Sequence, residues 1–124
     1  MIYMDYSTFA RLYSEAMESD SLDLYIGERG FQEWMNNFRI DQVGDILKTI
    51  FFLSKASLKE IREKYGYSRL ALSRKYYIPA RTLQEWENGN RTAPPYVTTM
   101  LYYTFFLDSI NSAEEYGDDF KKQN

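Results

Sequence analysis

The 124-residue sequence contains no cysteine and no histidine. The lack of cysteine excludes a disulfide framework, a thiol nucleophile and any metal site built from thiolates. The lack of histidine removes the commonest general base and the commonest zinc ligand. Because no nucleophile can be paired with a general base, we expect a protein that is not an enzyme and has no catalytic residue. We also expect neither a cofactor nor a metal ion.

Long apolar runs are absent as well. The longest ones, residues 50–53 and 100–107, are far shorter than the roughly 20 residues that cross a membrane. The first residues, MIYMDYSTF, lack the basic segment and the apolar run of a secretory signal. We therefore expect no membrane association and a cytoplasmic location, which the absence of cysteine also fits.

Charge is unevenly distributed along the chain, although the net charge is only −3. Residues 1–56 carry nine acidic and five basic side chains, and residues 108–124 carry five and two. Residues 57–107 between them carry four acidic and eight basic side chains. This basic segment is the part of the chain suited to a polyanion such as nucleic acid. Ordinary variation of charge along a chain is the alternative interpretation.

Apolar residues recur three and four positions apart along much of the chain, which is typical of amphipathic helices. Glycines at 66 and 89 and the proline pair at 94 and 95 mark ends of helices. No convincing strand pattern occurs, so the predicted fold class is all-α. The expected helices span residues 6–17, 26–38, 41–53, 58–64, 68–76, 79–87 and 95–110, with a loop at 18–23.

Two of these helices have clear start signals. Ser57 is followed three residues later by Glu60, which is the signature of a capping box. Ser68 is the expected cap of the next helix. Pro79 lies where a first-turn proline is tolerated, so we place the start of the helix 79–87 there.

The short helices at 68–76 and 79–87, joined by a tight turn, form a candidate reading unit for duplex DNA. Leu83 and Trp86, three residues apart, are expected to face the core together with Ile78. Arginine can donate two hydrogen bonds to guanine, glutamine can pair with adenine, and glutamate can accept from cytosine. The positions expected to face outward are Ala80, Arg81, Gln84, Glu85 and Asn88.

The stretch 58–107 resembles the Cro and phage-repressor (XRE-like) helix-turn-helix family. The run IPARTLQEWENGNR at 78–91 carries the resemblance most clearly, and Leu72 and Ser73 match an apolar and small pair in the preceding helix. The residues that match the recognition-helix pattern are Thr82, Leu83, Trp86, Glu87 and Gly89. The resemblance implies a lambda-repressor-like helix-turn-helix bundle that binds duplex DNA.

The resemblance also assigns roles to individual positions. The base-contacting positions of the family fall on Ala80, Arg81 and Glu85, with Gln84 nearby. The phosphate-contacting positions fall on Arg69, Asn88, Asn90 and Arg91, and Arg74 and Lys75 could add further backbone contacts.

Tyr77 departs from the family, which usually has glycine in the turn. A tyrosine at positive φ is strained, so the turn could differ here. Glu87 is expected to bond within the fold, to a backbone amide or a nearby arginine, and not to DNA.

The helix 95–110 is apolar on two sides, and a helix of that kind is covered on both. Tyr102 and Phe106 lie opposite the side that is expected to close the helix-turn-helix core. Either the N-terminal helices cover these two side chains, or a second subunit does in a homodimer. Both alternatives are open at this point.

We therefore expect an acidic helical N-terminal extension at 1–56, a DNA-binding helix-turn-helix domain at 57–110, and a polar, disordered tail at 111–124. The predicted function is a sequence-specific transcriptional regulator, such as a repressor, from a phage or other mobile element. The alternative is an interaction or inhibitor protein on a helix-turn-helix scaffold, in which the acidic surface of 1–56 binds a protein partner, for example a phage-encoded inhibitor of host defence.

Overall fold

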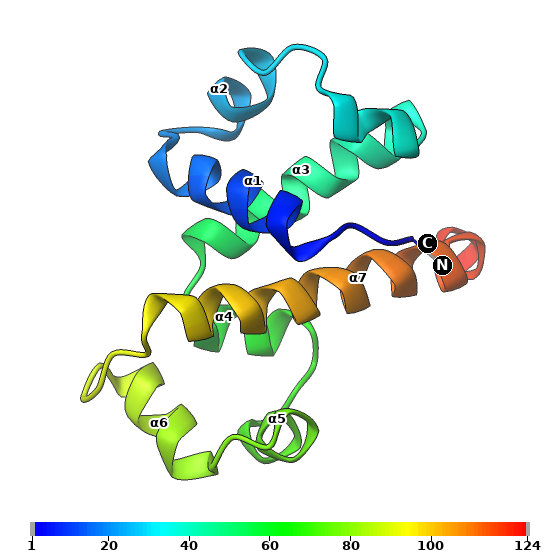
Figure 1. Ribbon diagram of the computed structural model, residues 1–124. Coiled ribbons are helices and arrows are strands. Elements are labelled where there is room, and N and C mark those ends of the chain that lie inside the picture. The colour runs from blue at the N-terminus through cyan, green and yellow to red at the C-terminus, as the bar shows by residue number, and fades with distance from the viewer. Residues whose placement is uncertain (1, 124) are drawn as a thin grey trace. The chain divides into compact units, whose positions relative to one another are not determined.

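The computed structural model describes the backbone of residues 2–123 and the side chains of residues 2–112. Over this part of the chain every regular element is a helix, which confirms the predicted all-α fold class (Figure 1). No helix among these residues is both long and apolar enough to span a bilayer. The elements are α1 Tyr6–Glu18, α2 Leu22–Gly27, the 3-10 helix η1 Glu33–Asn37, α3 Ile40–Lys55, α4 Leu58–Lys64, α5 Arg69–Tyr76, α6 Ala80–Asn88 and α7 Pro95–Gln123.

The chain divides into two compact units. The flanking unit consists of Met1–Lys55 and Thr99–Asn124, and the central unit consists of Ala56–Thr98. Residues up to 110 were expected to belong to the helix-turn-helix domain, whereas this division groups the residues from Thr99 onward with the N-terminal helices.

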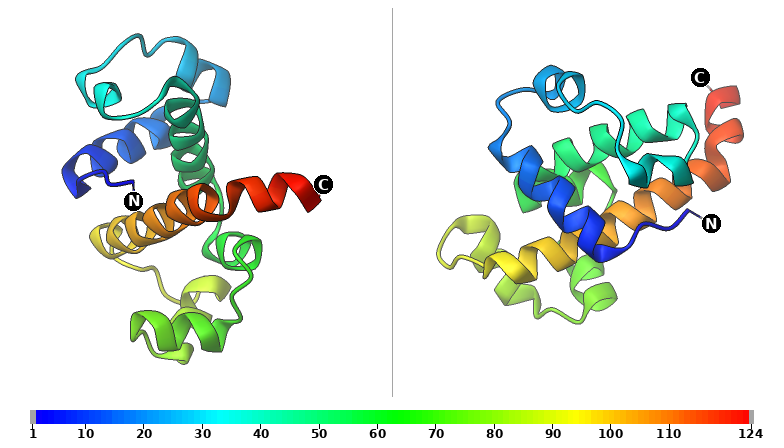
Figure 2. Two further views of the ribbon diagram at one scale, coloured as in Figure 1. Left: turned by 90° about the vertical axis from the view of Figure 1, so that its right-hand side faces the viewer. Right: turned by 45° about the horizontal axis from the view of Figure 1, so that its top comes forward.

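In the flanking unit, α1 packs against α3 (Figure 1, Figure 2). The Asp5 carboxylate caps α1 by accepting the backbone N–H of Thr8 at 2.7 Å, and the hydrogen bonds from Thr8 lower the pKa of Asp5. The predicted helices 6–17 and 41–53 are confirmed, and each is slightly longer than expected. The fully buried side chains between these helices are Phe9, Leu12, Ala16, Ile46, Ile50 and Leu53.

The prediction for the segment between these two helices was partly wrong. A loop does follow α1, but it covers only residues 19–21 of the expected 18–23, because the Ser21 hydroxyl accepts the N–H of Leu24 and starts α2 at residue 22. The expected helix 26–38 does not form, because α2 ends at Gly27 and Gly30 adopts a positive φ of 62°. A glycine in this left-handed conformation interrupts a helix. Only the short η1 follows it.

Arg29 ties this segment to α1. Its guanidinium pairs with the Glu15 carboxylate at 2.7 Å and lies 4.3 Å from the centre of the Tyr25 ring. The Tyr25 hydroxyl donates to the Leu12 carbonyl at 2.8 Å, which satisfies a buried polar group. These contacts connect the segment between α2 and η1 to α1.

Helix α1 covers the aromatic side of α7, for which the sequence left two alternatives open, the N-terminal helices or a second subunit. The ring of Phe106 lies 5.2 Å from that of Phe9, and the ring of Tyr102 lies 6.0 Å from that of Tyr13. Tyr102 and Phe106 are buried within one chain, and burial raises the pKa of Tyr102. The suggested homodimer through these two side chains is therefore wrong, since they have no surface to offer a second subunit.

Helix α7 continues past residue 110, where it was expected to end. The side chains of residues 113–124 lie outside the described part of the chain, so the predicted polar tail at 111–124 stays a prediction.

Candidate nucleic-acid interface

The central unit is built from α4, α5 and α6 around a small apolar core (Figure 1, Figure 2). Each helix contributes a fully buried side chain, namely Ile61, Leu72 and Leu83. The prediction that Leu83 belongs to the core is confirmed, and Trp86 one turn later is half-buried. The opposite side of α6 therefore remains available to face a ligand.

Side-chain caps fix where these helices start. The Ser57 hydroxyl accepts the N–H of Glu60, and the Glu60 carboxylate accepts the N–H of Ser57, both at 3.1 Å. This reciprocal pair confirms the predicted capping box. The Ser68 hydroxyl caps α5 in a simpler way by accepting the N–H of Ala71 at 3.0 Å.

Helix α6 starts one residue later than predicted. Pro79 is its cap and not its first residue, because ψ at Pro79 is an extended 135°. The Pro79 carbonyl nevertheless accepts the first helical hydrogen bond, from the N–H of Leu83 at 3.1 Å. The helix ends at Asn88 because Gly89 takes the left-handed conformation, with φ of 77°.

The turn between α5 and α6 forms in spite of the tyrosine at its centre. Tyr77 adopts φ 55° and ψ 39°, the left-handed conformation that glycine favours, and its side chain is 94% exposed. Beside it, the Ser73 hydroxyl donates to the Ile78 carbonyl, and the Ile78 N–H donates to the Ser73 carbonyl. These bonds hold the turn in a conformation that the Tyr77 side chain disfavours.

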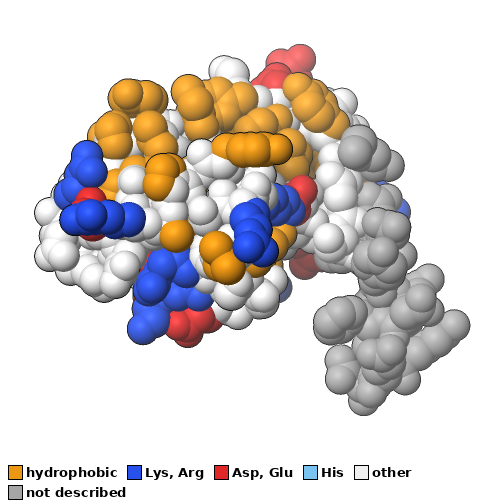
Figure 3. All heavy atoms as spheres, turned by 90° about the horizontal axis from the view of Figure 1, so that it is seen from below, with side chains coloured by type: hydrophobic (Ala, Val, Ile, Leu, Met, Phe, Trp, Pro, Cys, Tyr) orange, Lys and Arg blue, Asp and Glu red, His pale blue; other side chains and the backbone are white. Residues whose placement is uncertain are grey.

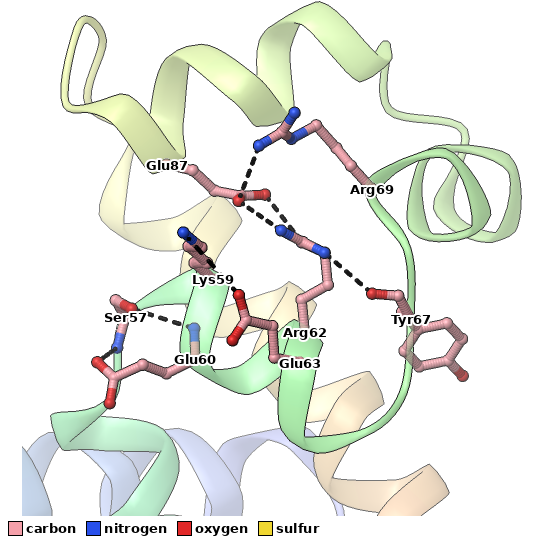
Figure 4. A network of polar contacts seen from close by, with 8 residues as sticks. All are labelled: Ser57, Lys59, Glu60, Arg62, Glu63, Tyr67, Arg69 and Glu87. Atoms are coloured by element: carbon pink, nitrogen blue, oxygen red, sulfur yellow. Dashed lines mark hydrogen bonds and ion pairs between the residues drawn. The ribbon is translucent and has the colours of Figure 1, made fainter.

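Glu87 connects all three helices through two arginines (Figure 4). Its side chain is only 1% exposed, and its carboxylate accepts hydrogen bonds from Nε of Arg62 at 3.1 Å and Nη2 of Arg62 at 2.9 Å. Arg69 adds a third contact at 3.4 Å. Arg62 also donates to the Tyr67 carbonyl at 3.1 Å. Glu87 thus bonds to nearby arginines within the fold, as the sequence predicted.

The electrostatics of this network favour the ionised carboxylate. Burial alone would raise the pKa of Glu87, because a buried charge loses its hydration. The hydrogen bonds from Arg62 and Arg69 outweigh burial and leave the pKa of Glu87 below its ordinary value. The same pairing raises the pKa of Arg62. Glu87 is therefore a structural group and is not available to DNA.

The residues predicted to contact bases fall into two sets on α6. Arg81 is 89% exposed and Gln84 is exposed, while Ala80 at the start of the helix is half-buried. Glu85 is different, since its carboxylate lies between two arginines. It is 3.4 Å from Nε of Arg81 and accepts a hydrogen bond from Nη1 of Arg91 at 3.2 Å.

The residues predicted to contact phosphates lie on α5, at the last residue of α6 and in the loop after α6. Arg74, Asn88, Asn90 and Arg91 are exposed, whereas Arg69 is partly buried by its pairing with Glu87. Lys75 is exposed but donates to the Tyr67 hydroxyl at 2.6 Å. Figure 3 looks onto the side of α5 and α6 and shows the basic side chains in separate clusters, with acidic side chains against some of them.

Residues 58–97, which lie within the central unit, match the family model described as helix-turn-helix. Residues 58–97 form an XRE/Cro-like helix-turn-helix domain. Such a domain implies DNA as a partner. Searches of the curated proteins and of the solved structures each found no match.

Sequence reasoning missed two contacts of the helix-turn-helix domain. It did not identify Arg62 as the main partner of Glu87, since 25 residues separate them and no local pattern connects them. It also treated Glu85 as free to contact a base. The spacing of four between Arg81 and Glu85 could have indicated their pairing on one helical face.

Proposed function

We propose that this protein is a sequence-specific, duplex-DNA-binding regulator of transcription that reads the major groove with α6. The observation that supports this proposal most strongly is that Arg81 and Gln84 are exposed on α6, while Leu83 and Glu87 anchor the other side of this helix. Direct readout of base edges requires a helix with exposed side chains that can form two hydrogen bonds to one base, as arginine and glutamine do.

The dimensions of α6 support this proposal. An α-helix with its side chains is about 10–12 Å across, which suits a major groove about 12 Å wide, and the nine residues of α6 extend about 13 Å along it at a rise of 1.5 Å per residue. In that position Arg81 suits guanine and Gln84 suits adenine, while Ala80 offers only a methyl contact to thymine. Arg81 and Gln84 would therefore contribute most of the sequence preference.

Groups around α6 would fix its position through the DNA backbone. Phosphate contacts position a protein on the duplex and supply salt-dependent affinity without reading sequence. The residues that we propose for these contacts are Arg69, Arg74, Lys75, Asn88, Asn90 and Arg91.

Further features of the predicted function also remain proposals. A repressor role, a phage or mobile-element origin and a cytoplasmic location are consistent with a small regulator. A homodimer through the N-terminal helices is also proposed, and dimers with a helix-turn-helix bind half-sites about one helical turn apart. The motif in the bound DNA would show this symmetry directly.

The test is selection of bound duplexes from a random pool, followed by sequencing. We expect an enriched motif that contains guanine, and loss of this enrichment with Arg81→Ala. A palindromic motif would indicate the homodimer. Recovery of the input pool without enrichment, at salt concentrations where the protein is folded, would contradict the proposal.

A protein partner for the acidic residues 1–56 is a second candidate function. Phe31 is 73% exposed and Ile40 is 93% exposed, and both lie in a segment rich in exposed carboxylates. Exposed apolar side chains among acidic ones suit a basic partner with apolar anchors. The test is co-purification with the wild type and with a Phe31→Ser, Ile40→Ser variant. A partner retained equally by both proteins would contradict this function for the segment.

A further inference from the structure

Glu85 is the point at which the exposed end of α6 and the following loop are joined. Its carboxylate contacts Arg81 one helical turn earlier and Arg91 in the loop, at 3.4 and 3.2 Å. Its backbone carbonyl accepts the N–H groups of Asn90 at 3.0 Å and Arg91 at 3.3 Å. We call the carboxylate with its two arginines the Glu85 bridge.

The Glu85 bridge contributes little to the stability of the fold. Arg81 and Arg91 are 89% and 66% exposed, and exposed ion pairs of this kind have small effects on folding. The loop is held mainly by the two backbone hydrogen bonds, which do not depend on the side chain of residue 85. The bridge therefore has more scope to affect DNA binding by the two arginines than to affect folding.

The bridge places a negative charge between two cationic groups that DNA would use. A phosphate that takes up Nη1 of Arg91, or a guanine that takes up Nε of Arg81, competes with the Glu85 carboxylate for that donor. The displaced carboxylate then faces the groove, where the acceptor atoms of guanine and thymine repel it and only the amino groups of cytosine or adenine can donate to it.

We propose that Glu85 is a specificity-determining residue that weakens binding to arbitrary duplexes and so sharpens discrimination among sequences. This inference rests on the proposed function and adds a mechanism to it. A site with guanine opposite Arg81 and an amino group near Glu85 satisfies all three side chains at once. Any other sequence leaves Glu85 repelled or leaves Arg81 and Arg91 paired within the protein, which is discrimination by an unfavourable contact.

The test compares wild type, Glu85→Gln and a matched control, Glu63→Gln, on an unselected mixed-sequence 20-base-pair duplex over a range of salt concentrations. Glu63 is an exposed carboxylate of α4, so its replacement removes the same charge without touching the bridge. Glutamine at position 85 keeps the size of the side chain and the backbone hydrogen bonds to Asn90 and Arg91.

We expect Glu85→Gln to bind the unselected duplex about 3- to 10-fold more tightly than wild type, with a log–log salt slope steeper by about 1 to 2, since each released cation contributes about 0.9. Glu63→Gln should change affinity less than 2-fold. In an Arg81→Ala, Arg91→Ala background the gain from Glu85→Gln should disappear, which assigns it to the bridge.

Each outcome separates this inference from the proposed function. If wild type binds duplex DNA and Glu85→Gln binds like Glu63→Gln or more weakly, the bridge does not restrain binding and only this inference is overturned. If Glu85→Gln binds duplex DNA and wild type does not, the inference that Glu85 weakens binding is supported. If neither protein binds any duplex while both remain folded by circular dichroism, both proposals are overturned.

Discussion

Arg62 donates two parallel hydrogen bonds to Glu87, at 3.1 and 2.9 Å, and this bidentate pair joins α4 to α6. Charge-assisted bonds in this geometry are stronger and more directional than bonds between neutral groups. The pair fixes α6, the helix that we propose enters the groove, to the remainder of the central unit.

Removal of the buried carboxylate tests this connection. Glu87→Ala should lower the free energy of unfolding by about 3 kcal/mol, because it leaves Arg62 largely buried without its counter-charge. Urea denaturation followed by circular dichroism measures the change. Glu63→Ala is the matched control, since its 4.0 Å ion pair with Lys59 is exposed and should contribute less than about 1 kcal/mol. Equal effects of the two substitutions would contradict the assigned role of Glu87.

The same pair makes stability depend on pH. The pKa of Glu87 lies below 4.5 in the folded protein, so the unfolded chain binds more protons in the interval between the two pKa values. The contribution of Glu87 is therefore fully present above about pH 4.5 and is lost as the pH falls through the folded pKa. Unfolding free energies measured from pH 6 to pH 3 should fall less steeply for Glu87→Gln than for wild type. Parallel curves would contradict this account.

The strained turn predicts a stabilising substitution. Tyr77→Gly should raise the free energy of unfolding by about 0.5 to 1 kcal/mol, since glycine adopts the left-handed conformation without the clash of a Cβ atom. Tyr77→Ala keeps the Cβ atom and should give no such gain. Thermal melts of wild type and the two variants measure the effect. Equal melting temperatures for the glycine and alanine variants would contradict backbone strain at position 77.

The burial of Phe106 against Phe9 predicts a large loss of stability without a change of oligomeric state. Phe106→Ala should cost about 3 to 5 kcal/mol, because it opens a cavity in a fully buried cluster. Phe31→Ala removes an equally large but exposed side chain and should cost less than about 0.5 kcal/mol. Light scattering measures the oligomeric state of wild type and of each variant. A wild-type dimer that dissociates in the Phe106→Ala variant would contradict the burial of Phe106 within one chain.

The sequence predicted the local features of the central unit well, because they depend on neighbouring residues. The Ser57 and Glu60 box needs only a spacing of three, and the burial of Leu83 follows from helical periodicity. The prediction for the segment after α1 was inaccurate, because the path of this segment also depends on Arg29, whose guanidinium pairs with a carboxylate 14 residues earlier in the chain. Arg91 reaches Glu85 only because the loop turns back after Gly89, and no periodic pattern encodes that return.

The central claim is that the helix-turn-helix domain binds duplex DNA with Arg81 of α6 reading a base. It is tested most directly by titrating wild type and Arg81→Ala against the selected duplex and an unselected one at several salt concentrations. We predict a log–log salt slope of about −4 for wild type on the selected duplex, since we propose that Arg69, Arg74, Lys75 and Arg91 each neutralise one phosphate there. Arg81→Ala should weaken binding to the selected duplex about 5- to 150-fold and affect the unselected duplex far less. A flat salt dependence, or an equal loss on both duplexes, would contradict the claim.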